Sequence, residues 1–390
     1  MILLYGCAPE TSEIEEKILE TSDVQEPLGE QEIIANESEL VKSQFAQMVE
    51  AIHNDDKEGF LEFQNSANSL FYKEQIRWLE ETAFKKKQGY TISVNIGEVN
   101  LLSSEKGTIE LIVNMKYEDN ESHNKVTYSI IKLNNMWVVD DVPFKVISEG
   151  NITVFYVSSL EEKALSVLKE ATDITGLYND KFGWKSGEIT IKLYDSREQV
   201  SATVPWSGLT GWNETGESLK LMTDTSSFSS FSFKVLVHEL AHKMLSDFSN
   251  DNVSLYIQEG FAGFLQSVVE RDETGKPSIN LNNLAEEEQQ LLMIEELVLL
   301  NISDLNELDY NQGLEINALG FLLTDYLITT QGFEKFLTMV NELLSEPYID
   351  SRTEHKFQTL SERTTNALEK VYGPTSQLSE DYISYFINKK

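Results

Sequence analysis

The pentapeptide His238-Glu239-Leu240-Ala241-His242 carries the strongest chemical signal in the sequence. Its two histidines are four residues apart, so on a helix they lie on one face, one turn apart. Two imidazoles in that arrangement can bind a single divalent cation, and the pattern is typical of zinc hydrolases. Glu239 is turned roughly 100° around the helix from His238, so it can contact a water on the metal without binding the ion. The pattern therefore predicts a metal site with Glu239 as general base. The alternative is a polar surface helix.

A third metal ligand is expected from the helix that follows. Glu259 comes seventeen residues after His242, within a helix predicted from Leu255 to Glu270. Two helices joined by a short loop pack antiparallel, which brings Glu259 back towards the histidine pair. Small residues beside it allow the helices to approach closely: Gly260, Ala262 and Gly263. A His, His, Glu site with water in the fourth position is predicted, the alternative being that Glu259 lies on the surface.

His238–His242 followed by Glu259-Gly260-Phe261-Ala262 resembles the gluzincin metallopeptidases, specifically the bacterial peptidase MA-like families. The resemblance extends over most of residues 150–345. It implies that His238, His242 and Glu259 bind Zn²⁺ and that Glu239 is the general base. It also implies that a strand at Glu217–Met222 is the sheet edge where a peptide pairs in extended form.

The sequence departs from that family at several positions. Gly263 stands where some gluzincins have an aspartate that braces a zinc-binding histidine, so the partner of the ligand imidazoles is unassigned. Asn317-Ala318 stands where relatives often carry a tyrosine. Tyr310 is therefore the candidate for stabilising the oxyanion, although Tyr310 and Tyr326 can also be purely structural. No Gly-x-Met-Glu-Asn segment occurs, which favours an endopeptidase over an aminopeptidase.

The resemblance implies hydrolysis of peptide bonds by attack of a zinc-bound water. Zinc lowers the pKa of that water from about 15.7 to about 7. Glu239 then takes the water's proton and delivers it to the leaving amine. Two other interpretations stay open: a binding or scaffold lipoprotein that keeps the fold without the chemistry, and an enzyme held latent by its first domain. The peptide or protein substrate is not identified by the sequence.

Residues 38–148 are expected to form a small domain of helices and an antiparallel sheet. Apolar residues recur at helical spacing over Val41–Ile52 and Leu70–Phe84, and Lys85–Lys87 are interpreted as a solvated helix end. The period then changes to two, which predicts four strands: Tyr90–Leu101, Thr108–Tyr117, Lys125–Leu133 and Met136–Val142. Asn134-Asn135 predicts a hairpin turn. This order resembles the nuclear transport factor 2-like superfamily, whose curved sheet forms a cone around a helix and can hold a ligand.

Residues 149–390 are expected to form the gluzincin-like domain, a small sheet followed mainly by helices. Strands are predicted at Ile152–Val157, Glu188–Tyr194 and Glu217–Met222, with a helix over Leu160–Tyr178. The metal motif lies in a helix predicted over Ser232–Phe248. The predicted fold class of the whole chain is therefore α+β.

The start of the chain resembles a lipoprotein signal. Leu4-Tyr5-Gly6-Cys7 is similar to the site at which bacterial lipoprotein signal peptides are cleaved, although the apolar stretch before Cys7 is short. Residues 1–37 contain ten acidic residues and one basic residue, Lys17, so a disordered tether is expected. We therefore expect an extracytoplasmic protein anchored to the bacterial cell membrane through a lipid on Cys7. The alternative is that Cys7 is an incidental thiol.

Composition excludes several classes of protein. The 390 residues carry 31 Lys+Arg and 65 Asp+Glu, a formal net charge of −34, so nucleic acid is not an expected partner. A single cysteine excludes a disulfide scaffold. No run of 18 apolar residues occurs, and a hydrophobic fraction of 41% is sufficient for folded cores.

Overall fold

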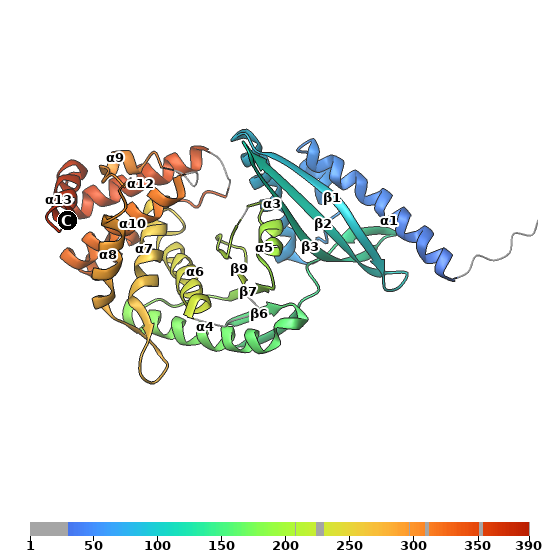
Figure 1. Cartoon of the computed structure of the whole chain (residues 1–390), viewed down its shortest axis with the longest axis horizontal. Helices are drawn as coiled ribbons and strands as arrows, with labels where there is room; N and C mark the ends of the chain where they lie inside the picture. The colour runs from blue at the N-terminus through green and yellow to red at the C-terminus, as the bar shows by residue number, and fades with distance from the viewer. Residues whose placement is uncertain are drawn as a thin grey trace, which may run out of the picture.

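The computed structural model describes residues 30–206, 208–223, 230–295, 297–308, 312–350 and 354–389. Cys7 and Tyr310 lie outside these residues, so their predicted roles stay predictions. Helices and two main antiparallel or mixed sheets make up the chain, which confirms the predicted α+β class. Figure 1 shows a first region of sheet and helices joined to a second region in which a small sheet precedes a group of helices.

The first region begins with helices and ends in an antiparallel sheet of order β1-β2-β3-β4. Its elements are α1 Glu30–His53, α2 Lys57–Leu61, α3 Ser69–Lys87, β1 Thr91–Leu101, β2 Lys106–Tyr117, β3 Asn120–Leu133 and β4 Met136–Val139. Asn134 and Asn135 both have positive φ, 50° and 65°, as the predicted hairpin turn requires. Helix α1 begins at Glu30, inside the segment predicted as a tether.

The core of the first region includes side chains from the second. Helix α5, Arg197–Thr203, packs against the sheet and places Val200 and Ala202 in the same buried cluster as Trp78 and Tyr128. The indole N–H of Trp78 donates to the carbonyl oxygen of Ala202 at 2.8 Å. A cavity of about 20 Å³ remains there, which has room for roughly one water molecule. Helix α5 therefore fills the space where the predicted cone would hold a ligand.

A five-stranded sheet of order β5-β6-β7-β9-β8 opens the second region. Its strands are β5 Lys145–Glu149, β6 Ile152–Tyr156, β7 Ile189–Tyr194, β8 Gly211–Trp212 and β9 Leu219–Met222, and α4 Glu161–Phe182 connects β6 to β7 after a short 3-10 turn at Ser158–Leu160. Strands β6, β7 and β9 are parallel, whereas β8 is antiparallel to β9. The sheet thus begins at Lys145, four residues before the predicted boundary.

The position of β9 corrects one prediction. The strand predicted at Glu217–Met222 as the sheet edge lies between β7 and β8, and the edge is the two-residue strand β8. Two residues are too short to show a period of two, so the sequence pattern does not predict β8.

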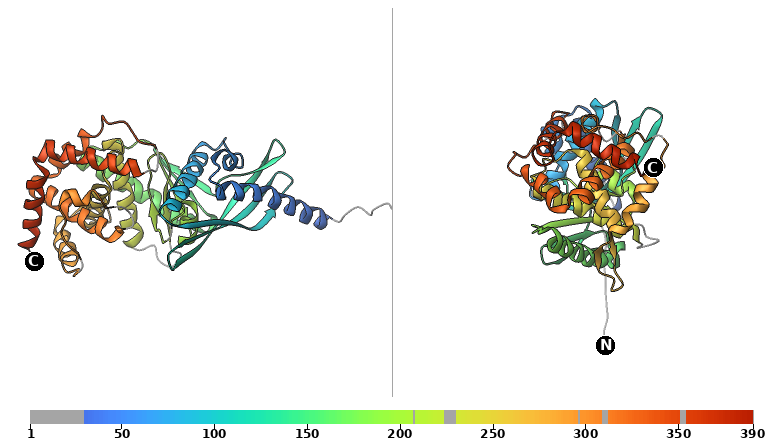
Figure 2. Two further views of the ribbon diagram at one scale, coloured as in Figure 1. Left: turned by 90° about the horizontal axis from the view of Figure 1, so that it is seen from above. Right: turned by 90° about the vertical axis from the view of Figure 1, so that its left-hand side faces the viewer.

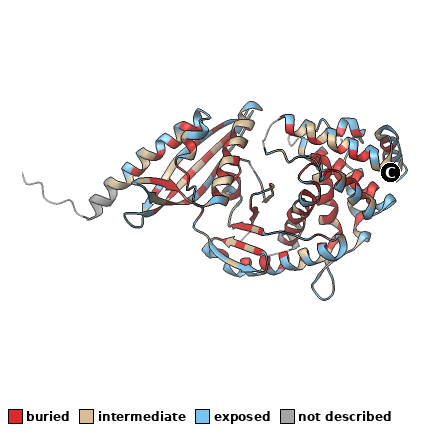
Figure 3. Ribbon diagram, turned by 180° about the vertical axis from the view of Figure 1, so that it is seen from behind, coloured by how far each residue is buried: buried red, intermediate tan, exposed pale blue. Residues whose placement is uncertain are grey.

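The rest of the second region is mainly helical, as Figure 2 shows from two further sides. Its elements are α6 Ser230–Ser249, α7 Leu255–Val268, the hairpin β10 Val269–Arg271 with β11 Pro277–Ile279, a 3-10 turn Leu281–Asn283, α8 Leu284–Leu292, α9 Ile302–Leu305, α10 Gly313–Gln331, α11 Phe333–Glu342, α12 Glu354–Tyr372 and α13 Thr375–Ile387. Buried side chains concentrate on α6, α7 and α10 (Figure 3). No described helix is long and apolar enough to cross a membrane.

Helices α7 and α10 make backbone contact at two glycines. A Cβ atom on Gly260 would lie 2.1 Å from the carbonyl oxygen of Gly320, and a Cβ on Gly320 would lie 2.1 Å from that of Tyr256. Any larger residue would push the helices apart, so the close approach that Gly260 allows is made to α10, whereas the sequence predicted it towards the helix of His238 and His242. Because Glu259 directly precedes Gly260 on α7, this contact sets the position of Glu259 relative to α10.

Asp325 on α10 is fully buried and sits next to a second carboxyl group, Glu288 on α8. Burial, together with the neighbouring carboxylate of Glu288, raises the pKa of Asp325 to about 8, against a weaker opposing effect of Lys389. Lys389 donates to Glu288 at 2.6 Å. Asp325 is therefore protonated at neutral pH in the folded protein.

We expect Asp325→Asn to stabilise the protein at alkaline pH. The pKa of Asp325 in the folded protein, about 8, lies above the unfolded value of about 3.9, so the folded state binds the extra proton between these values. Wild-type stability should fall as pH rises through this window, by at most about 1.4 kcal/mol per pH unit, whereas the variant lacks this loss. Urea unfolding at pH 4.5, 6.5 and 8.5 measures the difference.

Asp119→Asn, in an exposed turn of the first region, is the matched control and should leave the pH dependence unchanged. A stability difference between Asp325→Asn and wild type that is the same at all three pH values contradicts the assignment.

Candidate metal centre

Helix α6 presents His238, Glu239 and His242 to a cleft while its other face is buried. Val237, Leu240 and Ala241 have no exposed surface, and the phenol of Tyr178 on α4 donates to the carbonyl oxygen of Val237 at 2.9 Å. The helix is therefore held from behind by the core. This burial argues against the alternative of a polar surface helix.

The structure brings the three predicted ligands together. Nε2 of His238 lies 3.0 Å from Nε2 of His242, and these atoms lie 3.4 Å and 3.5 Å from Oε2 of Glu259. A tetrahedral zinc ion with bonds of about 2.0–2.2 Å requires donor atoms separated by about 3.3–3.6 Å. The three donors thus match a zinc site to within a few tenths of an ångström. Among the described residues, this is the one such cluster of three.

The charges of the cluster are coupled. Burial lowers the pKa of His238, but the hydrogen bond and charge of Glu259 outweigh it and bring the value to about 8. Burial raises the pKa of Glu259, and the two histidines outweigh it and hold the value well below normal. Glu259 is therefore ionised beside the two imidazoles. A divalent cation at this point would replace the proton that the imidazoles otherwise share with the carboxylate.

Glu239 faces the same cleft but stands apart from the three donors. Its side chain is 7% exposed, and burial is the main cause that raises its pKa. A Cβ atom on Gly211 of β8 would lie 2.2 Å from Oε1 of Glu239. The edge strand thus packs directly on this carboxylate, and a larger residue at position 211 would require the Glu239 side chain to shift.

Gln266 on α7 is the partner of a ligand histidine that sequence reasoning left unassigned. Its Oε1 accepts a hydrogen bond from Nδ1 of His238 at 3.0 Å, which leaves the lone pair of Nε2 for a metal. Lys234, one turn before His238, holds the end of α7 in place by donating to the carbonyl oxygens of Gln266 at 2.6 Å and Val269 at 2.8 Å. A glutamine seven residues after Glu259 has no distinguishing pattern, so no sequence signal identifies it.

The donors line a cleft of about 1060 Å³. One wall is β8 with the segment before it, including Trp206, Leu209 and Trp212. Leu291 on α8 and Leu314 and Phe321 on α10 also line it. The cleft is large enough for several residues of an extended peptide.

The open edge of β8 has backbone groups available to a ligand. The backbone N–H of Met222 on β9 donates to the carbonyl oxygen of Thr210 at 2.9 Å. Gly211 lies opposite Leu221 in the next pair of the ladder. Bonded and non-bonded pairs alternate in an antiparallel ladder, so Gly211 directs its N–H and C=O away from β9. These groups therefore point to the cleft side of the sheet.

The two tyrosines considered for the oxyanion role have different outcomes. Tyr310 lies outside the described residues. Tyr326 is 9% exposed on α10 and contacts the rings of Tyr382 and Tyr385, so it belongs to the core. The oxyanion role of Tyr310 stays a prediction, and Tyr326 is structural.

Comparison with known proteins gives a weak structural likeness. No family model matches the sequence, and no curated protein matches it. One similar structure is that of Legionella pneumophila aminopeptidase A in complex with aspartic acid: TM-score 0.39, 11% identity, with 76% of this chain and 33% of that chain covered. Another is an M1 zinc metallopeptidase from Deinococcus radiodurans: TM-score 0.37, 12% identity, with 75% and 61% covered. The chain spans about a third of the first protein and under two thirds of the second, so the argument for function rests on the site.

We expect the purified protein to bind one zinc ion per chain with the help of Gln266. Gln266→Ala should weaken zinc binding about 10- to 100-fold because Nδ1 of His238 loses its partner. His238→Ala should abolish zinc binding because a ligand is removed. Competition with a fluorescent zinc chelator measures both affinities without any need for a substrate.

Gln290→Ala is the matched control, since Gln290 lines the same cleft but donates to Glu286 instead of accepting from a ligand histidine. It should keep the wild-type zinc affinity. Metal-free protein after gentle purification would overturn the site, and equal affinities of Gln266→Ala and wild type would overturn the role of Gln266.

Proposed function

We propose that this protein is a zinc-dependent metallopeptidase. One observation carries the proposal: three donor atoms with the spacing of a zinc site lie in a large cleft beside a fourth, non-ligating carboxylate, Glu239. Ligands alone would fit a structural metal. Hydrolysis needs, in addition to the metal, a general base beside it, and the buried carboxylate of Glu239 can serve as that base.

The residues of the site divide the work. When bound, zinc supplies Lewis acidity to a substrate carbonyl and makes a water acidic enough to lose its proton near neutral pH. His238, His242 and Glu259 hold the ion, and Gln266 orients His238. Glu239 accepts the proton of the attacking water on its carboxylate and delivers it to the leaving amine.

The open edge of β8 supports a peptide as the substrate. An extended chain can add to that edge through the N–H and C=O of Gly211. Because Gly211 packs on Glu239, a peptide paired with it would pass directly over the general base. The cleft therefore offers backbone hydrogen-bonding groups that an extended peptide can use.

Endopeptidase activity is the finer proposal. It is supported by the lack of a Gly-x-Met-Glu-Asn segment in the sequence. Mass spectrometry of cleaved unfolded protein distinguishes internal cuts from stepwise removal of N-terminal residues. Stepwise removal alone would overturn the finer proposal and leave the metallopeptidase in place.

We expect Glu239→Gln to separate hydrolysis from metal binding. The amide keeps the shape of the side chain but cannot accept the proton, so peptide hydrolysis should fall by about 10²–10⁴-fold. Zinc content should stay near wild type, because Glu239 is not one of the three donors. The rate is measured as the appearance of new termini in unfolded casein, abolished by chelation.

Glu270→Gln is the control for this variant. Glu270 also lines the cleft, but its carboxylate accepts hydrogen bonds from Asn280 and Asn283. It should retain most of the activity. If Glu239→Gln leaves hydrolysis or the cellular phenotype intact, the binding or scaffold interpretation replaces the enzyme.

We further propose that the protein is extracytoplasmic and anchored to the cell membrane by a lipid on Cys7. The support is the sequence around Cys7 and the acidic segment that follows it. The native protein should partition into detergent and incorporate labelled fatty acid, whereas Cys7→Ser should move it to the soluble fraction. An unmodified Cys7 in a cytoplasmic fraction would contradict this proposal and leave the zinc site unaffected.

A further inference from the structure

Helix α3 of the first region makes a row of contacts with the second region. Glu74, Arg77, Glu81 and Lys85 recur at helical spacing and are all buried, although the sequence predicted that Lys85 would be solvated. All four contact the second region: Glu74 its sheet, Arg77 the segment before α12, and Glu81 and Lys85 the side chain of Trp206. Since α5 fills the interior of the first region, this row is the feature through which the first region acts on the cleft.

Glu74 ties α3 to the strands of the second sheet. Its carboxylate accepts from Lys192 on β7 at 2.6 Å and from the backbone N–H of Ser218 at 3.1 Å. Ser218 immediately precedes β9, which pairs with the edge strand β8. The position of the cleft edge is therefore linked to α3 through two hydrogen-bonded strands.

Glu81 and Lys85 hold a residue of the cleft wall. The indole N–H of Trp206 donates to Oε1 of Glu81 at 2.8 Å. Nζ of Lys85 lies 3.2 Å from the centroid of the same indole, within cation–π range. Trp206 lines the cleft next to Trp212, with ring centroids 6.1 Å apart. Two charged residues of the first region thus fix the orientation of an aromatic side chain that lines the cleft.

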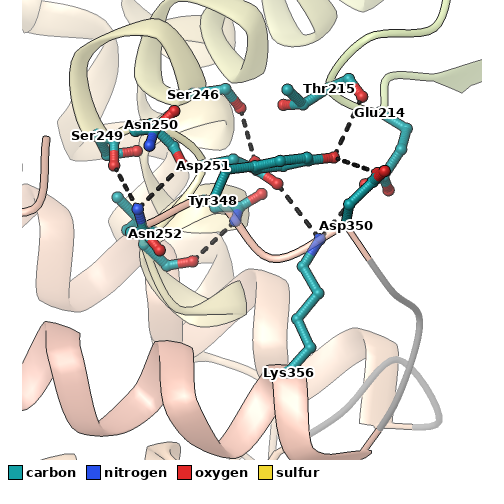
Figure 4. Close-up of polar contacts among 12 residues, drawn as sticks. Glu214, Thr215, Ser246, Ser249, Asn250, Asp251, Asn252, Tyr348, Asp350 and Lys356 are labelled. Atoms are coloured by element: carbon teal, nitrogen blue, oxygen red, sulfur yellow. Dashed lines mark hydrogen bonds and ion pairs between the residues drawn. The ribbon is translucent and has the colours of Figure 1, made fainter. Parts of the chain in front are cut away.

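Arg77 connects α3 to the C-terminal helices. It donates to the phenol of Tyr348 at 2.7 Å and pairs with Asp350. Figure 4 shows the Tyr348 phenol between Asp350 and Thr215, which belongs to the loop after β8.

The same loop is held from the C-terminal side as well. Nζ of Lys356 on α12 lies 3.5 Å from Oε1 of Glu214 in this loop and 3.3 Å from Oδ2 of Asp251 (Figure 4). The rings of Phe84 on α3 and Phe357 on α12 are 5.9 Å apart. Helix α3 therefore contacts both the sheet of the second region and its C-terminal part, at Tyr348 and α12.

We infer that α3 positions the substrate-binding wall, with Glu81 and Lys85 acting through Trp206, and that this wall selects peptides with a large apolar side chain. This inference rests on the proposed peptidase function. The first region is then a part of the peptidase and not a separate ligand-binding module. An indole held by a carboxylate and a cation stays in one orientation, so a substrate side chain meets a preformed apolar surface formed by Trp206 and Trp212.

Glu81→Ala tests the inference against Glu80→Ala. Glu80 is the preceding residue of α3, and its carboxylate pairs with Lys57 of the first region. Glu81→Ala should raise KM for fluorescent unfolded casein about fivefold or more, the factor expected for loss of a hydrogen bond of about 1 kcal/mol. Its kcat and zinc content should stay within twofold of wild type. Glu80→Ala should match wild type, and Glu81→Gln, which still accepts from the indole, should restore KM.

A second measurement does not depend on turnover. In protein labelled with ¹⁵N-tryptophan, the Trp206 indole resonance is assigned by its loss in Trp206→Phe. Glu81→Ala should shift this resonance and speed its hydrogen exchange, whereas Glu80→Ala should leave it unchanged. Trp206→Phe should itself raise KM, which keeps the test open if Glu81→Ala does not fold.

The outcomes separate the inference from the proposed function. Wild-type protein that cleaves no casein contradicts the peptidase. An unchanged Trp206 resonance in Glu81→Ala overturns the positioning role. A shifted resonance with unchanged KM overturns the role of this wall in substrate binding, and so does a preference for peptides without large apolar side chains.

Discussion

A buried carboxylate, Glu74, holds the two regions of the chain in one arrangement. It is 4% exposed; burial alone would raise its pKa, but Lys192 and Lys220 bring the value down to about 2. Its carboxylate lies 2.6 Å from Nζ of Lys192 on β7 and 3.8 Å from Nζ of Lys220 on β9. The ion pairs therefore penalise any arrangement in which α3 separates from β7 and β9.

The geometry of the metal site depends on that arrangement in steps. Strand β9 pairs with β8 and so positions it, and Gly211 of β8 packs on Glu239. On the other side, contact between Gly260 and Gly320 sets the position of Glu259, while Lys234 and Gln266 fix the end of α7 and the ring of His238. Glu239 is thus packed from the sheet side, whereas His238 and Glu259 are held from the side of α7 and α10.

The sequence predicts those parts of the structure that local patterns encode. The hairpin at Asn134-Asn135, the strands of the first sheet and the helix that carries His238 and His242 follow from turn chemistry and periodicity over a few residues. The approach of Glu259 to the histidines follows from antiparallel packing of two neighbouring helices.

Other features depend on contacts between distant segments. Lys85 is buried because Trp206, far along the chain, stacks beneath it. Gln266 became a partner of His238 through the register of two packed helices, and β8 became the sheet edge through pairing with β9. Polar side chains in such places have the same local pattern as solvated ones, so periodicity does not distinguish them.

The insertion of α5 into the first region affects the order in which the chain can fold. Val200 and Ala202 complete a core whose other members precede residue 143, apart from Tyr194 and Val204. During synthesis, domains generally fold as they emerge, at about 5–20 residues per second. Here the first sheet and helices emerge with an apolar face that stays uncovered until some sixty further residues have followed. Until α5 has followed, the first region exposes this apolar face, to which chaperones for unfolded chains can bind.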